Sequence, residues 1–381
     1  MDKKFVMSIA AMAALTLVSC SSDDLDSLSD NSSKNVAISF DGYLGRSAVA
    51  VNGTRGSVET VKTLKDNGFG VFGNYTPTGG QSSDFFVNQK VTYSTTESKW
   101  TYTPLKFWPA NGEINFLAYA PFVKNKTLNN TSFDFTVADK AADQQDLLWS
   151  NAKGQITADF ASTKANVKFQ FRHALSRLGY TVKLSGNYLP KDVTFTLKKI
   201  TLAGSSNETT KAFYETGTID LATKIIPATP ATDLWTPKKD TKKNFTWFDA
   251  GDQTVNITYV DPTKPEETSV SNKDYLFVIP QNFSEKIADA SGQQIENPDK
   301  LYVIVEYEIN YKSGTPSTIT NKVYKQITPN FLQGKAYMLN LTIGRPIEFD
   351  VNLTEGVGVE GWGTDEGINI GSDGNLWDGI E

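Results

Sequence analysis

The sequence has very few of the residues that carry most enzymatic chemistry. Its 381 residues include one cysteine, Cys20, and one histidine, His173. A Ser-His-Asp or Cys-His site would have to use that histidine. A zinc site would lack its usual ligands, and no disulfide can form within the chain. We therefore expect no enzyme, no metal centre and no cofactor. Catalysis that needs only carboxylates, as in glycosidases, is nevertheless compatible with this composition.

Positive charge is also scarce. The chain has 37 Lys+Arg against 43 Asp+Glu, a net charge of −6. This balance disfavours nucleic acid as a partner, because binding to phosphates requires a basic face. Apolar residues make up 39% and aromatic residues 12% of the chain, which is enough for well-formed cores. Five of the cations are arginines, namely Arg46, Arg55, Arg172, Arg177 and Arg345.

The N-terminus has the features of an exported lipoprotein in their usual order. Two lysines, Lys3 and Lys4, precede an apolar run over 5–18 that is too short to span a bilayer and fits a signal peptide. The run ends in Leu-Val-Ser-Cys, which resembles a bacterial lipobox. We predict a signal peptide over 1–19, an acylated Cys20 that anchors the chain in outer-membrane lipid, and a flexible Ser/Asp-rich tether over 20–35.

Beyond residue 35 the chain has the pattern of β-strands. Apolar and polar residues alternate with a period of two, and the runs are separated by Gly, Asn, Pro and Ser. The best helix candidate is 138–148. Many strands joined by turns indicate an all-β protein built as an antiparallel sandwich. The expected strands are 36–44, 69–75, 86–93, 114–119, 167–171, 178–184, 193–202, 255–260, 276–279, 301–311, 337–343 and 347–353.

The length of the chain favours two domains. The segment 158–166 is polar and rich in small residues, and a new group of strands begins after it. We therefore expect an N-terminal β-sandwich domain over 36–164 and a C-terminal β-sandwich domain over 165–381, the latter ending in a Gly/Asp-rich tail.

Three motifs have an ordinary structural interpretation. A G-x-G-x-x-G pattern starts at Gly68, but no helix is expected after it, so we interpret it as a Gly-rich strand rather than a nucleotide site. His173 follows an apolar strand and is expected to be structural. The seven tryptophans could include sugar-stacking platforms, although core packing is the more common role of Trp in a sandwich.

The first strand is the most informative feature. It has an apolar face and is followed by a stretch of small residues that contains two of the five arginines, Arg46 and Arg55. Such stretches are where proteases cut. An Arg-specific cut would release the anchor and the strand together and leave a groove with two unpaired edges. The residues on the apolar face of this strand are Val36, Ile38, Phe40 and Leu44.

A groove of this kind can be filled by a strand from another subunit, which is β-augmentation. The alternating segment 347–353, near the C-terminus, has a suitable pattern and is the candidate donor strand. Alternatively, both strands pair within their own domains. The apolar residues of the candidate donor are Ile347, Phe349, Val351 and Leu353.

The chain resembles the fimbrillin-like proteins of the Bacteroidales, the subunits of type V pili. The resemblance covers nearly the whole mature chain and depends on the order and spacing of several segments. These are the lipobox, NVAISFDGYLGR at 35–46, GFGVFGNYT at 68–76, WTYTPLKFWPANGEINFLAYAP at 100–121, QQDLLWS at 144–150, VKFQFRHALSRLGYTV at 167–182, YLFVIPQ at 275–281 and FLQGKAYMLNLTIG at 331–344.

This resemblance implies two tandem transthyretin-like β-sandwich domains, export as a lipoprotein through Cys20, and removal of the N-terminal segment by an Arg-specific surface protease. Arg46 is the first choice for the cut because it follows the strand directly, and Arg55 is the second. The implied partners are other fimbrial subunits, and the implied location is a fimbria on the outer membrane at the cell surface, with a role in adhesion.

Two other functions are compatible with the same export signal. One is a surface-exposed lipoprotein that binds glycans as a monomer through exposed tryptophans. The other is a hydrolase that uses carboxylates, although no pair of acidic residues can be placed at a catalytic distance from the sequence.

Overall fold

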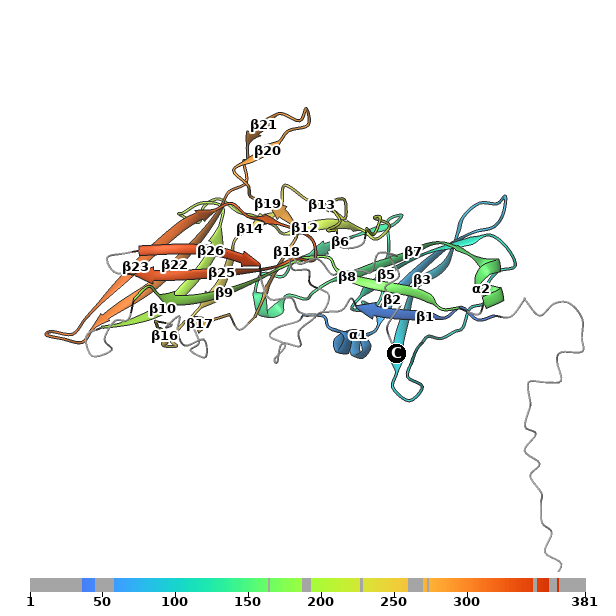
Figure 1. Ribbon diagram of the computed structural model, residues 1–381, viewed down its shortest axis with the longest axis horizontal. Helices are drawn as coiled ribbons and strands as arrows, with labels where there is room; N and C mark the ends of the chain where they lie inside the picture. Colours follow the sequence, from blue (N-terminus) through green and yellow to red (C-terminus); the bar gives the residue numbers. More distant parts are fainter. Residues whose placement is uncertain are drawn as a thin grey trace, which may run out of the picture.

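The computed structural model describes residues 36–44, 58–163, 165–186, 193–226, 229–259, 270–272, 274–344, 348–355 and 362. Almost all regular structure in these residues is β-strand, so the all-β prediction is confirmed. The molecule is elongated, with one group of sheets at each end (Figure 1).

The first group is a single seven-stranded sheet that curls around a core. Its end strands meet, because the indole Nε1 of Trp100 in β4 donates a hydrogen bond to the carbonyl of Gly42 in β1 at 3.2 Å. Apolar side chains from strands at both ends and in the middle fill the interior. The strands in spatial order are β1 (Phe40–Leu44), β8 (Val167–His173), β7 (Leu148–Ile156), β5 (Glu113–Ala120), β2 (Phe69–Thr76), β3 (Ser83–Ser94) and β4 (Lys99–Thr101).

The second group is a sandwich of two five-stranded sheets. One sheet contains β15 (Phe245–Asp249), β10 (Val193–Ala203), β22 (Leu301–Tyr311) and β23 (Ser317–Ile327), with β16 (Val255–Ile257) beside β10. The other contains β17 (Val270–Ser271), β9 (Ser176–Leu184), β25 (Ala336–Gly344) and β26 (Glu348–Glu355), with β18 (Leu276–Val278) beside β9.

Short elements surround these sheets. A hairpin of β20 (Lys286–Ala288) and β21 (Gln294–Glu296) projects from the body (Figure 1). Two helices of seven residues, α1 (Val61–Asn67) and α2 (Thr157–Thr163), lie beside the first sheet. The remaining small sheets are β6 (Ser132–Thr136) with β12 (Thr216–Asp220) and β13 (Trp235–Pro237), β11 (Phe213–Tyr214) with β14 (Lys242–Lys243), and β19 (Gln281–Asn282) with β24 (Asn330–Phe331).

The central strands of the first sheet are buried on both faces. In β2, Val71 belongs to the core inside the curled sheet, and its neighbour Phe72 belongs to the core that continues into the sandwich. In β5, Phe116 belongs to the core inside the curled sheet and Leu117 to the core that continues into the sandwich. Leu148 in β7 belongs to the core inside the curled sheet. This explains why these strands have nearly continuous apolar runs, since neither face of the strand meets water.

Each strand run expected from alternation contains a strand, although in the run 255–260 the strand covers only Val255–Ile257 and residue 260 lies outside the described residues. The helix expected over 138–148 is wrong, because the segment contains only a three-residue 3₁₀ turn, Ala141–Asp143. A polar side chain of this segment bonds to a residue far away in the chain. The Gln144 side-chain oxygen accepts a hydrogen bond from the Phe277 backbone N–H at 2.6 Å, and this contact holds the segment in its extended path. The helices α1 and α2 were not expected, and both are too short to show a clear 3.6-residue period.

Two pairs of strands are parallel, β1 with β8 and β9 with β25, within sheets that are otherwise antiparallel. The strand β8 begins after the expected domain boundary at 164/165, yet it pairs with β1 and β7 of the first sheet. The first sheet therefore extends past that boundary to His173. The segment expected to link the domains, 158–166, includes most of α2.

Candidate assembly site

The residues 36–44, which we call the first-strand segment, have hydrogen-bonded neighbours on both sides. On one side β1 pairs with β8 from Phe40↔Val167 to Leu44↔Phe171. On the other side the Ile38 N–H donates to the Lys106 carbonyl at 2.8 Å, and the Trp108 N–H donates to the Val36 carbonyl at 3.0 Å. The segment therefore lies between β8 and the stretch 106–108, which belongs to no strand of the sheet, and its removal would leave both without their partner.

The apolar face of the first-strand segment lies deep in the core. Ile38, Phe40 and Leu44 are 1%, 2% and 1% exposed, and Val36 is half-buried against the same core. We call the space that this face fills the β1 groove. Its aromatic wall packs against the Phe40 ring, with centroid distances of 5.3–5.7 Å to Phe86, Tyr102, Phe116 and Phe169.

The expected donor strand pairs within the same chain in this structure. As β26 it forms an antiparallel ladder with β25, from Gly344↔Glu348 to Tyr337↔Glu355. Val351 is 8% exposed and Leu353 is half-buried against the core of the second group. Ile347 and the side chain of Phe349 lie outside the described residues.

The expected processing and lipidation residues, Cys20, Arg46 and Arg55, lie outside the described residues. The arginines belong to the segment 45–57, and the described residues on either side of it, Leu44 and Val58, are both buried.

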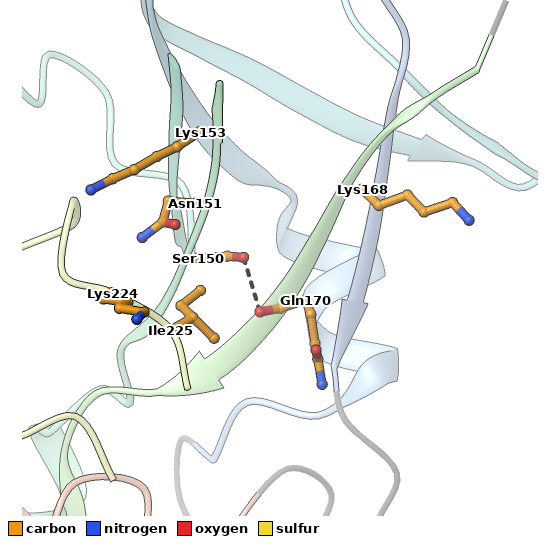
Figure 2. A pocket seen from close by; sticks show the side chains of 7 residues that line it. All are labelled: Ser150, Asn151, Lys153, Lys168, Gln170, Lys224 and Ile225. Atoms are coloured by element: carbon orange, nitrogen blue, oxygen red, sulfur yellow. Dashed lines mark hydrogen bonds between the residues drawn. The ribbon is translucent and has the colours of Figure 1, made fainter. Parts of the chain in front are cut away.

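A pocket of about 520 Å³ lies on β7 and β8 under the loop that follows β12. Its lining includes Lys153, Lys168 and Lys224 beside Ser150 and Gln170, and contains no carboxylate or histidine. Lys168 points away from the other two lysines (Figure 2). The pocket therefore lacks an acid–base pair and does not gather its three positive charges around one point.

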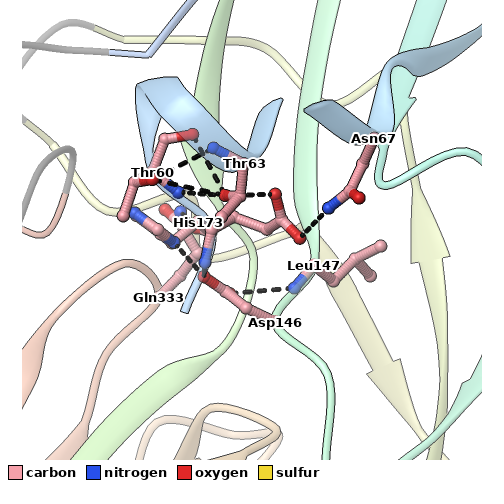
Figure 3. A network of polar contacts seen from close by, with 8 residues as sticks. Thr60, Thr63, Asn67, Asp146, Leu147, His173 and Gln333 are labelled. Atoms are coloured by element: carbon pink, nitrogen blue, oxygen red, sulfur yellow. Dashed lines mark hydrogen bonds and ion pairs between the residues drawn. The ribbon is translucent and has the colours of Figure 1, made fainter. Parts of the chain in front are cut away.

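A buried polar network lies where β8 ends, close to the junction of the two groups of sheets (Figure 3). His173 is fully buried, and its Nδ1 lies 2.7 Å from Oδ2 of Asp146. The same Asp146 oxygen accepts the Glu59 backbone N–H at 3.0 Å. The side-chain amide of Gln333 donates to the His173 carbonyl. The histidine thus connects three segments of the chain, which is a structural role.

Glu59 connects this network to the segment that follows the expected cleavage stretch. Its carboxylate accepts hydrogen bonds from the Thr63 hydroxyl at 2.8 Å and from the Asn67 amide at 3.2 Å, both on α1. Thr60 caps the helix. Burial is the main cause that raises the pKa of the Glu59 carboxyl to about 7. The sequence analysis did not identify Glu59 or Asp146, because no motif includes them and their burial depends on contacts between distant parts of the chain.

One residue of the C-terminal tail contacts the same network. The Trp362 ring, 3% exposed, stacks on His173 with centroids 4.0 Å apart and planes at 22°. The Arg177 guanidinium lies 5.2 Å from the Trp362 ring centroid and 4.4 Å from that of Tyr275. The side chains of His173 and Arg177 are therefore used in packing this junction.

The six tryptophans with described positions are all buried, so none of these six offers an exposed ring on which a sugar could stack. Trp377 lies outside the described part. Within the described residues, no group of three or more His, Cys, Asp and Glu side chains could hold a metal ion. In the same part of the chain no helix is long and apolar enough to cross a membrane.

Comparison with known proteins agrees with this architecture. The model of the fimbrillin-like family matches residues 54–362. The Fimbrium subunit Fim1C of Phocaeicola vulgatus is 25% identical over 390 residues, covering 95% of this chain and 97% of that protein. A crystal structure of a fimbrial protein from Bacteroides vulgatus has the same fold, with a TM-score of 0.56, 20% identity, and coverage of 84% of this chain and 99% of the other. The chain belongs to the fimbrillin-like family.

Proposed function

We propose that this protein is a structural subunit, of the stalk or the tip, of a cell-surface fimbria that serves adhesion. Its assembly follows cleavage by an Arg-specific surface protease and proceeds by donor-strand exchange between subunits. The main support is the placement of the first-strand segment, which has paired edges on both sides and a buried apolar face. Family membership and the Fim1C relative also support it.

The energetic basis of the proposal is apolar burial. Three fully buried side chains in the first-strand segment, at roughly 1.5–3 kcal/mol each, give about 5–9 kcal/mol of stabilisation before entropy costs. Once the chain is cut at Arg46 or Arg55, the segment is held only by these contacts and its hydrogen bonds. A strand from another subunit then competes for the groove.

The donor comes from the C-terminal part of a second subunit, and 347–353 is the candidate that the sequence provides. Its alternation matches a strand with one buried face. To donate, it would have to leave β25, with which it pairs in the single chain. Before assembly, Cys20 holds the chain on outer-membrane lipid.

A pair of conservative substitutions tests the processing step. In Arg46→Lys/Arg55→Lys the charge of the segment is unchanged, but an Arg-specific protease has no site between residues 45 and 57. We expect this variant to stay monomeric and lipid-tethered after protease treatment, while wild type forms an oligomer ladder in size-exclusion chromatography. Each single variant serves as the control that identifies the cut. Equal assembly of the double variant and wild type would refute the processing step.

Mass analysis of the mature surface protein gives an independent readout. Under the proposal the N-terminus is Ser47 after a cut at Arg46, or Gly56 after a cut at Arg55. An acylated Cys20 at the N-terminus of subunits taken from assembled fimbriae would contradict it.

A further inference from the structure

The pocket on β7 and β8 lies where these two strands separate. Their ladder consists of Leu148↔His173 and Trp149↔Arg172 and then stops, although both strands continue. At the next position the Ser150 hydroxyl donates a hydrogen bond to the Gln170 carbonyl at 2.9 Å. A side chain thus replaces the backbone partner, and the strands part over a hollow of about 520 Å³ in the outer face of the sheet.

The loop that follows β12 is fixed over this hollow from both strands. The Asn151 side-chain amide of β7 donates to the Leu221 carbonyl at 2.7 Å. The Arg172 guanidinium of β8 donates to the Ile226 carbonyl at 2.9 Å. The part of the loop between these two anchors lines the pocket. Its position is therefore set by the protein itself, as is usual for a site that is formed before its ligand arrives.

The pocket is positively charged, although the chain has more acidic than basic residues. Lys153 and Lys224 lie with Asn151 on one side of the pocket, and Lys168 points away from them (Figure 2). Among the described residues, neither Lys153 nor Lys224 has a carboxylate partner. Lys168 lies opposite Asp41 in the β1–β8 ladder. Lys153 and Lys224 therefore provide most of the positive charge that a ligand would meet.

The rest of the lining indicates what carries the complementary negative charge. The side-chain amides of Asn151 and Gln170 are suited to hydrogen bonds with hydroxyl groups, and Ile225 offers an apolar surface to the C–H groups of a sugar ring. Lysines from two different elements suit charges that are spaced along a chain better than one compact phosphate. A polysaccharide with acidic groups has both the charges and the hydroxyls, whereas an acidic peptide has mainly the charges.

We propose that this pocket binds an anionic glycan. Its carboxylate or sulfate groups pair with Lys153 and Lys224, and its ring hydroxyls bond to Gln170 and to the side-chain oxygen of Asn151. The inference rests on the proposed function only for its biological role, adhesion. The binding itself is a property of the single folded chain and needs neither cleavage nor strand exchange, so a failure to bind would leave the proposed assembly unaffected.

The test uses the uncut mature chain with Cys20→Ser and isothermal titration calorimetry. Oligogalacturonate and dextran sulfate distinguish a carboxylate from a sulfate ligand, and dextran is the neutral control. We expect one or both of the charged glycans to bind at least about tenfold more tightly than dextran. Binding of neither charged glycan would overturn the inference. Tighter binding of poly-glutamate than of both charged glycans would also overturn it, in favour of an acidic peptide.

A pair of double variants locates the binding. Lys153→Gln/Lys224→Gln should weaken binding of the charged glycan by at least about tenfold, because both charged partners are lost. The matched control is Lys211→Gln/Lys239→Gln, which removes the same charge at two exposed lysines outside the pocket and should stay within about twofold of wild type. Equal losses in the two variants would show general attraction between charges rather than a site, and would overturn the inference.

Two neighbouring positions of the loop provide a second test. Ile225 lines the pocket, while the next residue, Ile226, is 48% exposed and does not. Ile225→Glu should weaken glycan binding by at least about tenfold, and Ile226→Glu, which adds the same charge one residue away, by about threefold or less. Urea unfolding checks that each variant is folded, and the lysine variants decide the question if Ile225→Glu is not. Equal weakening by the two glutamates would contradict a site at this pocket.

Discussion

Replacing Phe40 by alanine tests whether the first-strand segment is an integral part of the core. The ring is 2% exposed and contacts four aromatic rings. Truncation of a buried Phe to Ala removes its transfer free energy and leaves a cavity, at a total cost of about 3–5 kcal/mol. We therefore expect Phe40→Ala to lower the unfolding free energy of the first group of sheets by about that amount.

Urea unfolding of the mature chain, followed by tryptophan fluorescence, measures this loss, because Trp100 and Trp108 lie in the same core. The matched control is Phe107→Ala, the same substitution on the neighbouring segment at a side chain that is 46% exposed. We expect the control to cost about 1 kcal/mol or less. If Phe40→Ala costs no more than Phe107→Ala, the first-strand segment does not fill a groove, and the reasoning about exchange fails with it.

Three further outcomes follow from the packing around this groove and the buried network. Gly42→Val should destabilise the uncut chain by about 1–3 kcal/mol through overpacking, as measured by urea unfolding, because a Cβ atom at Gly42 would lie 2.8 Å from Cε1 of Phe69. Glu59→Gln should flatten the pH dependence of stability. The folded chain holds the Glu59 proton with a pKa of about 7 against an ordinary 4.5, so the wild-type stability from this group is present below about pH 4.5 and lost as pH rises to about 7. Trp362→Ala should lower stability by about 3–5 kcal/mol and speed hydrogen exchange at the end of β8, because the ring stacks on His173.

Each of these outcomes has a control in the same part of the chain. Asp41→Val places the same valine side chain one position from Gly42, where the strand faces outward and the side chain of Asp41 already has room, and should cost less. Glu97→Gln changes an exposed carboxylate and should leave the pH profile unchanged. Phe277→Leu, beside Trp362, keeps most of the buried volume and should cost less than Trp362→Ala. Equal effects within any pair would contradict the corresponding argument.

Most of the strands could be predicted from the sequence, because a strand with one buried face has a period of two that is visible locally. The segment 138–148 shows the limit of this approach. Its residues have a weak helical pattern, but Gln144 and Asp146 bond to groups far away in the chain, and those contacts override local propensity. The parallel pairing of β1 with β8 was also not predictable, since alternation does not identify a partner strand.

The sequence by itself determined the all-β class and the apolar face of the first-strand segment, because each is a pattern of neighbouring residues. Only the tertiary structure decided that this segment is paired on both edges, that Gly42 faces Phe69, and that Glu59, Asp146 and His173 form one buried network. These depend on which distant segments become neighbours. Phe40 and Val167 pair across more than 120 positions, and a periodicity of two residues contains no information on that choice.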